Sequence, residues 1–165
     1  MPTIRRIVSA LAVSALVILL PGAALAQETP KMQVSASPFL IMYKYFNVEF
    51  ERRATASNTW GVSTSFVPGS TADYRNVGAF WHFYPSGQAL RGFYLGGRVQ
   101  VHHGSTIGAS ATLGGVGFEL GKNWILGSRT LVGFGVGVTR LFGGPLAGDS
   151  LTLPTFRLAN VGVTF

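Results

Sequence analysis

Hydrophobic and polar residues alternate one by one along most of the chain after residue 33, a pattern typical of β-strands. Around residue 118, for example, Val116, Phe118 and Leu120 alternate with glycines and Glu119. Gly, Pro, Ser and Asn clusters separate the alternating segments and indicate turns. The pattern predicts eight strands, at residues 34–42, 46–54, 60–67, 75–83, 93–103, 112–124, 130–142 and 155–165.

The connections between these strands are expected to be short. Residues 104–111 and 143–149 are small and polar, and we expect both to be loops. A long helical pattern is missing from the sequence after residue 26, and residues 86–91 alone could form one helical turn.

The first 26 residues have the organisation of a secretory signal peptide. Arg5 and Arg6 precede an apolar stretch at residues 7–20, and residues 24–26 (Ala-Leu-Ala) form a small-residue cleavage site. An uncleaved N-terminal anchor at residues 7–26 is the alternative. The predicted organisation is a cleaved signal peptide (1–26) followed by one barrel domain (27–165).

The identity of the two strand faces indicates which of them points outward. One face carries Val, Leu, Phe and Trp, and the other carries Gly, Ser, Asn, Gln and the charged residues. An eight-stranded barrel has a narrow interior that suits the small and polar face, whereas the large apolar side chains would overfill it. Only 12% of the residues are charged, too few to keep the reverse arrangement soluble. We therefore predict an all-β, eight-stranded antiparallel up-and-down transmembrane barrel with a polar, side-chain-filled interior.

Composition excludes several classes of function. The chain has no cysteine, which rules out disulfides, thiolate metal sites, a cysteine nucleophile and lipoprotein acylation. Its net charge of +7 is carried by scattered residues without a basic patch, so nucleic acid is not an expected partner. An anionic membrane surface is as good a partner for this positive charge as nucleic acid.

The C-terminal segment adds a second indication of the outer membrane. Val161, Val163 and Phe165 alternate up to the last residue. This resembles the C-terminal strand of bacterial outer-membrane barrels, where a terminal aromatic residue is the signal for the barrel assembly machinery. The resemblance implies export through the secretory pathway and insertion into the outer membrane.

Two further segments carry a family resemblance. Residues 46–53 (FNVEFERR) and 83–96 (FYPSGQALRGFYLG) are similar to an uncharacterised family of small bacterial outer-membrane proteins, filed as a domain of unknown function. The resemblance implies a fold and a location, and it implies no activity.

Several charged and histidine residues have the parity of the polar face. We expect them to form one paired network inside the barrel, because an unpaired buried ion costs several kcal/mol. The network would block water flow, and a catalytic carboxylate pair or a proton path is the alternative. Its predicted members are Glu49, Glu51, Arg53, His82, Arg98, His102 and Glu119.

His103 and Ser105 are the best candidates for catalysis. Outer-membrane lipid A deacylases use a serine, a histidine and an acid, with the histidine and serine two residues apart and facing lipid, and this spacing is similar. The chain departs from that family at Thr106, where those enzymes have asparagine, and the nearby acid, Glu119, is predicted to face inward. A serine nucleophile needs both a base and an orienting acid. No metal site or cofactor is expected, since adjacent histidines on a strand point to opposite faces.

Basic residues are also predicted near the outer rim. With both mature termini in the periplasm, four cations fall near the outer ends of the strands, and the parity of the three arginines points them to lipid. Guanidinium groups suit phosphate, which lipid A displays in the outer leaflet. We expect a lipopolysaccharide-binding patch formed by Lys44, Arg140 and Arg157, with Arg75 as a separate contact. The alternative is that these side chains snorkel to the interface without a fixed ligand.

These features favour a monomeric, non-enzymatic outer-membrane barrel with a structural or envelope-interaction role, and contact with lipopolysaccharide is one expected interaction. A lipid A-modifying hydrolase acting at the outer rim, or a narrow pore, are the alternatives.

Overall fold

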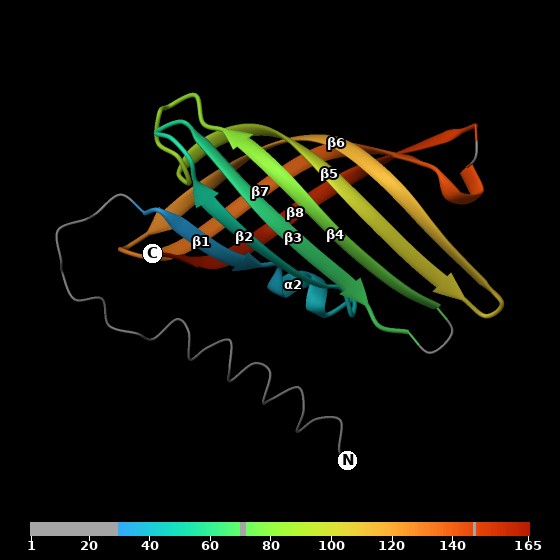
Figure 1. Cartoon of the computed structure of the whole chain (residues 1–165). Helices are drawn as coiled ribbons and strands as arrows, with labels where there is room; N and C mark the ends of the chain where they lie inside the picture. Colours follow the sequence, from blue (N-terminus) through green and yellow to red (C-terminus); the bar gives the residue numbers. More distant parts are fainter. Residues whose placement is uncertain (1–29, 70–71, 147) are drawn as a thin grey trace, which may run out of the picture.

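The computed structural model describes residues 30–69, 72–146 and 148–165, which form a closed barrel of eight antiparallel strands (Figure 1). Each strand pairs with the next along the chain, and β1 pairs with β8 to close the ring. The predicted eight-stranded barrel is confirmed. The elements in chain order are β1 (Met32–Ala36), α2 (Pro38–Ile41), β2 (Phe46–Arg53), β3 (Asn58–Val67), β4 (Ala72–Phe83), β5 (Gly92–Thr106), β6 (Ala109–Leu126), β7 (Thr130–Phe142), the short 3-10 helix η1 (Gly144–Leu146) and β8 (Ser150–Thr164).

The two ends of the described chain meet at one end of the barrel, where the backbone N–H of Met32 donates to the carbonyl oxygen of Phe165. We call this end the terminal end and the opposite end the distal end. The predicted signal peptide at residues 1–26 lies outside the described residues. Across the three described ranges, no helix is long and apolar enough to span a bilayer.

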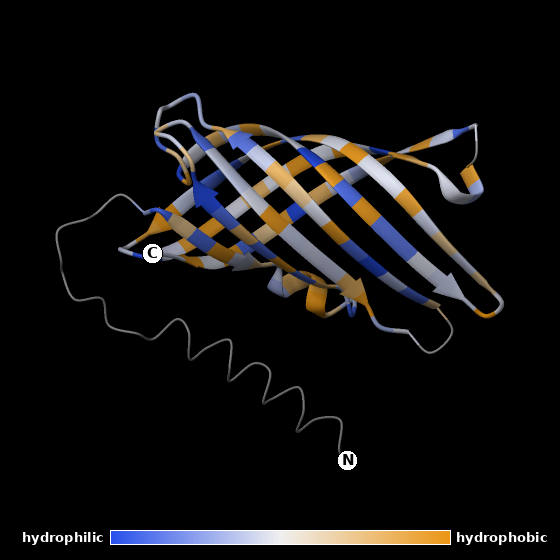
Figure 2. Ribbon diagram, viewed as in Figure 1, coloured by the Kyte–Doolittle hydropathy of each residue, from blue (hydrophilic) through white to orange (hydrophobic). Residues whose placement is uncertain are grey.

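The faces of the barrel are divided by polarity, and Figure 2 shows the alternation along each strand. Fully buried positions inside the barrel carry polar groups such as Gln33, Glu51 and His82. Outward positions carry exposed apolar side chains on every strand, among them Val34, Val48, Trp60, Val77, Val99, Phe118, Phe134 and Phe156. The polar interior predicted from glycine, serine and charge is therefore present.

The barrel wall is tall on one side and short on the other. β6 has 18 residues, whereas β1 has five and β2 has eight. β1 pairs with β8 only through residues 33–36 and 161–164, so the distal part of β8 extends beyond its partner strand. The helix α2 follows β1 and packs beside β8 at this step in the wall (Figure 1).

Three predicted segments, one strand and two connections, differ from the structure. The strand expected at 34–42 ends at Ala36, because Pro38 occupies the start of α2, a position that suits proline's fixed φ. The loop expected at 104–111 is instead the continuation of β5 and β6, joined by a two-residue turn in which Gly108 has a φ of +85°. Residues 86–91 form turns and no helix.

An irregularity in β8 changes which residues face inward. The register with β7 shifts between Gly133 and Gly135, which pair with Asn160 and Arg157. β8 therefore contains one extra residue here, and Ala159 has a φ of +43°. A bulge of this kind reverses the alternation along the strand, so positions before and after it have opposite parity.

The terminal end of the lumen is closed by side chains. The loop at residues 84–91 folds across the opening, and Tyr84, Ala89 and Leu90 are buried. Tyr94 crosses the lumen from β5 and is also fully buried. A Cβ atom at Gly121, the partner of Tyr94 on the neighbouring strand β6, would lie only 2.5 Å from the Tyr94 hydroxyl, so this ring fits because the wall beside it is bare.

Candidate functional site

Six ionisable side chains from five strands meet inside the barrel: Glu49, Glu51, His82, Arg98, Glu119 and Arg157. The shortest arginine–carboxylate pair joins Arg98 Nη2 to Glu119 Oε2 at 2.6 Å. Arg157 Nη2 lies 2.7 Å from Glu49 Oε2, and Arg98 Nη2 lies 3.8 Å from Glu49 Oε1. Glu49 and Glu119 are therefore linked through Arg98. We call these six residues the charge network.

His82 links the third carboxylate, Glu51, to Glu119. Its Nδ1 atom lies 2.9 Å from Glu51 Oε1 and its Nε2 atom lies 2.5 Å from Glu119 Oε1. An imidazole donates from both nitrogens only when it is protonated. With His82 charged, three cations balance three carboxylates and the buried group is neutral, which avoids the cost of an unpaired buried ion.

Two tyrosines connect the charge network to the closed terminal end. The Tyr84 hydroxyl donates to Glu51 Oε1 at 3.0 Å and accepts from Asn123 Nδ2 at 3.1 Å. Arg157 Nη1 donates to the Tyr94 hydroxyl at 3.0 Å. Burial, reinforced by the Glu51 carboxylate, raises the pKa of Tyr84 well above its usual value. The tyrosines extend the hydrogen-bonded filling down to the loop at 84–91.

The structure brings together five of the seven predicted interior residues, and Arg53 and His102 lie apart from them. Arg53 is at the end of β2, where its Nε atom donates to the carbonyl oxygen of Thr55 at 3.2 Å. The Nδ1 atom of His102 lies 2.7 Å from the Tyr74 hydroxyl, on the distal side of the charge network. By alternation along their strands both residues point inward, but alternation does not determine how far along the barrel axis a residue lies.

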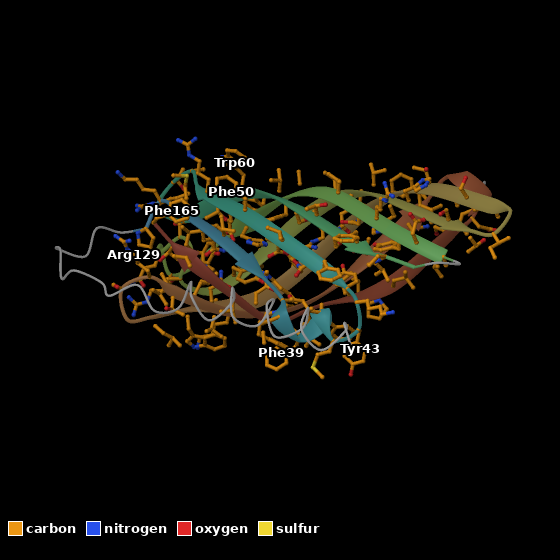
Figure 3. All side chains as sticks on the ribbon, turned by 90° about the horizontal axis from the view of Figure 1, so that it is seen from below. Phe39, Tyr43, Phe50, Trp60, Arg129 and Phe165 are labelled. Atoms are coloured by element: carbon orange, nitrogen blue, oxygen red, sulfur yellow. The ribbon has the colours of Figure 1, made fainter. Side chains whose placement is uncertain are left out.

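Arg157 corrects the sequence analysis. It was expected on the lipid-facing side, yet it is 5% exposed and pairs with Glu49 inside the barrel. The bulge at Ala159 is the reason, because parity counted back from Phe165 is reversed beyond it. Phe165 itself projects outward at the terminal end (Figure 3). Val161 and Val163, on the same side of the bulge, keep the parity of Phe165.

Without Arg157, the predicted basic patch retains Lys44 and Arg140. Arg140 lies on the outer face of β7, where its Nε atom donates to Ser150 Oγ at 2.9 Å. Lys44 is in the turn after α2, with a φ of +59°. Arg75 is exposed near the distal start of β4 and lies 3.4 Å from Asp73 Oδ2. Lys44, Arg75 and Arg140 thus stay outside the lumen at separate positions on the wall.

His103 and Ser105 do not hydrogen-bond to each other in the described structure. Ser105 Oγ donates to Asp73 Oδ1 across the β4–β5 pair. His103 Nδ1 instead lies 2.9 Å from Thr112 Oγ1 on β6. In a hydrolytic triad the histidine stands between the serine and the acid, whereas here the serine contacts the acid directly.

Asp73 was missed from the sequence as a partner of Ser105. It lies 32 positions away along the chain, and only the β4–β5 register places it opposite the serine. Other residues missed in the same way are Tyr84, Asn123 and Asn160, and the Asn160 amide donates to Glu49 at 2.8 Å. In the sequence, only their place on the polar side of the alternating pattern marks these residues.

Within the described ranges, no cluster of three or more His, Asp or Glu side chains is arranged to hold a metal ion. No family model, curated protein or solved structure matches the chain.

Proposed function

We propose that this protein is a bacterial outer-membrane barrel with a structural or envelope-interaction role and a closed lumen. The observation that carries the proposal is the inversion of its faces: apolar side chains are exposed on all eight strands, while ionised side chains are buried inside. A water-soluble barrel has the opposite arrangement. In a bilayer an apolar outer face is favourable, and a closed ring leaves few backbone groups without partners.

The closed lumen supports a role other than conduction. The charge network spans the barrel from β2 to β6, and the buried side chains of Tyr84, Leu90 and Tyr94 lie towards the terminal end. Opening a path for ions would require breaking several ion pairs at once. The outer face is then the surface available for contact with lipid and envelope partners.

The outward cations support contact with lipopolysaccharide. Arg75 and Arg140 lie near the distal ends of β4 and β7, and a cation near an interface costs only about 0–1 kcal/mol. Lys44 follows the exposed apolar residues of α2 and its turn, Phe39 and Tyr43, which project from the barrel in Figure 3. Guanidinium groups in this position suit the phosphates of lipid A.

Insertion is tested by refolding residues 27–165 into detergent micelles and lipid vesicles. We expect heat-modifiable migration on gels, a β-type circular dichroism spectrum and protection of the strands from protease in vesicles. A protein that remains in the aqueous phase without detergent, folded and monomeric, would contradict the proposal. Black-lipid recordings are expected to show no steady conductance for the parent protein.

Lipopolysaccharide contact is tested separately. The double variant Arg75→Gln/Arg140→Gln should lose most of the thermal stabilisation that lipopolysaccharide gives to the parent. The matched control is Arg129→Gln, which changes a cation in the β6–β7 turn at the terminal end, away from the distal rim (Figure 3). Equal stabilisation of the parent and the double variant would disprove the contact.

A further inference from the structure

The distal half of the lumen contains two adjoining cavities of different character. The first has a volume of about 220 Å³ and rests on the charge network, since Arg98, Glu119 and Arg157 line it. The second has a volume of about 310 Å³ and lies against the first, with Tyr74, His102, Pro154 and Thr155 lining both. Together they reach the size of sites that bind small organic molecules, roughly 300–1,000 Å³.

The first cavity, which we call the polar chamber, is lined mainly by neutral hydrogen-bonding groups: Tyr45, Asn47, Ser63, Ser65, Tyr74, Asn76, Gln100 and His102. Some buried atoms of its lining have no partner within the described chain, namely Gln100 Oε1, Arg98 Nε and Arg157 Nε. Buried polar atoms are normally satisfied by protein, water or ligand. Because these three atoms are themselves buried, the groups that a bound molecule can contact directly are the amides and hydroxyls of the lining.

The second cavity, which we call the apolar chamber, is unusual for the interior of this barrel. Leu113, Leu141 and Leu153 line it, together with Ala111 and Gly104. Most other buried side chains of the lumen are polar, apart from Phe80, Leu90 and Leu131, so three leucines around one cavity depart from the pattern. Such a surface favours an alkyl or aryl group over water.

The charges at the floor define what the polar chamber accepts. Arg98 and Arg157 are already paired with Glu119 and Glu49, so an anion would compete with a carboxylate for each guanidinium. A cation would have to displace an arginine from a carboxylate. A neutral group rich in hydroxyls can hydrogen-bond to the amides and hydroxyls of the lining without disturbing these pairs.

We propose that the two chambers form one binding site for a small, neutral glycoside. Its sugar ring occupies the polar chamber against Gln100 and Asn76, and its alkyl or aryl aglycone occupies the apolar chamber against Leu141 and Leu153. The charge network closes the site towards the terminal end, so the site is a cup and not a channel.

The test uses the refolded protein in lipid nanodiscs and the methyl, butyl and hexyl β-D-glucosides as probes in calorimetric titrations, with empty nanodiscs as the blank. Saturable binding is expected, and affinity should rise about fourfold for each added methylene until the apolar chamber is full. Absence of saturable binding to the parent by the hexyl glucoside, or affinity independent of alkyl length, would overturn the proposal.

Variants assign the two chambers. Leu153→Gln should lower the affinity for the hexyl glucoside about tenfold and leave the methyl glucoside unchanged. Leu151→Gln is the matched control, because Leu151 has the same parity on the same strand but does not line the chamber. Gln100→Leu should lower the affinity for all three glucosides three- to tenfold. Equal effects of Leu153→Gln and Leu151→Gln would overturn the placement of the aglycone.

Two further readouts keep the outcome specific. Heat-modifiable migration of each variant shows that the barrel is intact, so loss of binding is separated from loss of fold and from failure of the membrane proposal. Lipopolysaccharide added to the nanodiscs should leave hexyl glucoside binding unchanged. Displacement of the glucoside would assign the site to a membrane glycolipid and overturn the proposal of a small, neutral glycoside.

Discussion

The two halves of the lumen are enclosed by the same sheet but are filled differently. Towards the terminal end, ionised groups and tyrosines are packed against each other, and Glu51, His82 and Tyr84 have no exposed surface. Towards the distal end, the strands surround cavities, and Leu153 remains 40% exposed inside the barrel. The comparison teaches that packing differs along the barrel axis: ion pairs and tyrosines fill the terminal half, whereas the distal half leaves cavities between its side chains.

The largest test of this comparison removes one ion pair of the packed half. Arg157→Gln leaves Glu49 without its closest cation, and breaking a buried pair typically costs about 3–5 kcal/mol. The free energy of unfolding, measured by urea titration in detergent, should fall by that amount. The matched control is Arg140→Gln, an outward arginine on the neighbouring strand, for which we expect a loss of at most about 1 kcal/mol. Similar losses for both variants would place Arg157 on the outer face, as its parity first indicated.

Arg157 also shows what the sequence could and could not predict. Strand number, closure and the polarity of the two faces follow from alternation and turn residues, because side chains on a strand point to opposite sides at successive positions. The bulge at Ala159 is invisible to that reasoning, since no glycine or proline marks it in the segment 155–161. One extra residue therefore moved Arg157 from the predicted lipid face to the centre of the charge network.

The candidate sites were harder to predict for a related reason. Parity identified Glu49, Glu51, His82, Arg98 and Glu119 as inward, but their contacts depend on the register between strands that are distant in sequence. The Ser105–Asp73 contact has the same origin, and it replaced the serine–histidine contact that local spacing indicated. The missed helix α2 reflects a local rule, because Pro38 was counted as a strand residue although it begins a helix.

The second test compares glycines in the two halves. A Cβ atom at Gly121 would lie 2.4 Å from the Phe134 carbonyl oxygen and 2.5 Å from the Tyr94 hydroxyl, so Gly121→Ala should destabilise the barrel by about 1–3 kcal/mol. At Gly104, in the hollow half, the nearest atom to an added Cβ is 3.9 Å away. Gly104→Ala is expected to be neutral or to stabilise by up to about 1 kcal/mol. The same urea titrations measure both, and a large loss at Gly104 would show that the distal half is packed as well.

The third test uses pH. The raised pKa of Tyr84 means that the folded state keeps its proton when the unfolded chain loses it. Stability from this group is complete below about pH 10, the ordinary tyrosine value, and declines as pH rises above it. Tyr84→Phe should cost about 1 kcal/mol at pH 8 through lost hydrogen bonds and should then lose less stability than the parent between pH 9 and pH 11. Parallel decline of the two proteins over this interval would mean that Tyr84 is hydrated at the terminal end.

The smallest expected effect concerns Thr139, which lines the apolar chamber. Its hydroxyl is buried and has no hydrogen-bond partner within the described chain. Valine has the same shape, so Thr139→Val removes an unsatisfied polar atom and adds apolar surface beside Leu141 and Leu153. The free energy of unfolding should rise by up to about 1 kcal/mol, because an unpaired buried donor is costly and its apolar replacement is not. Hexyl glucoside binding should be kept or strengthened. A destabilised Thr139→Val variant would mean that ordered water satisfies the hydroxyl. Water would then fill both chambers, and the second chamber would not be apolar.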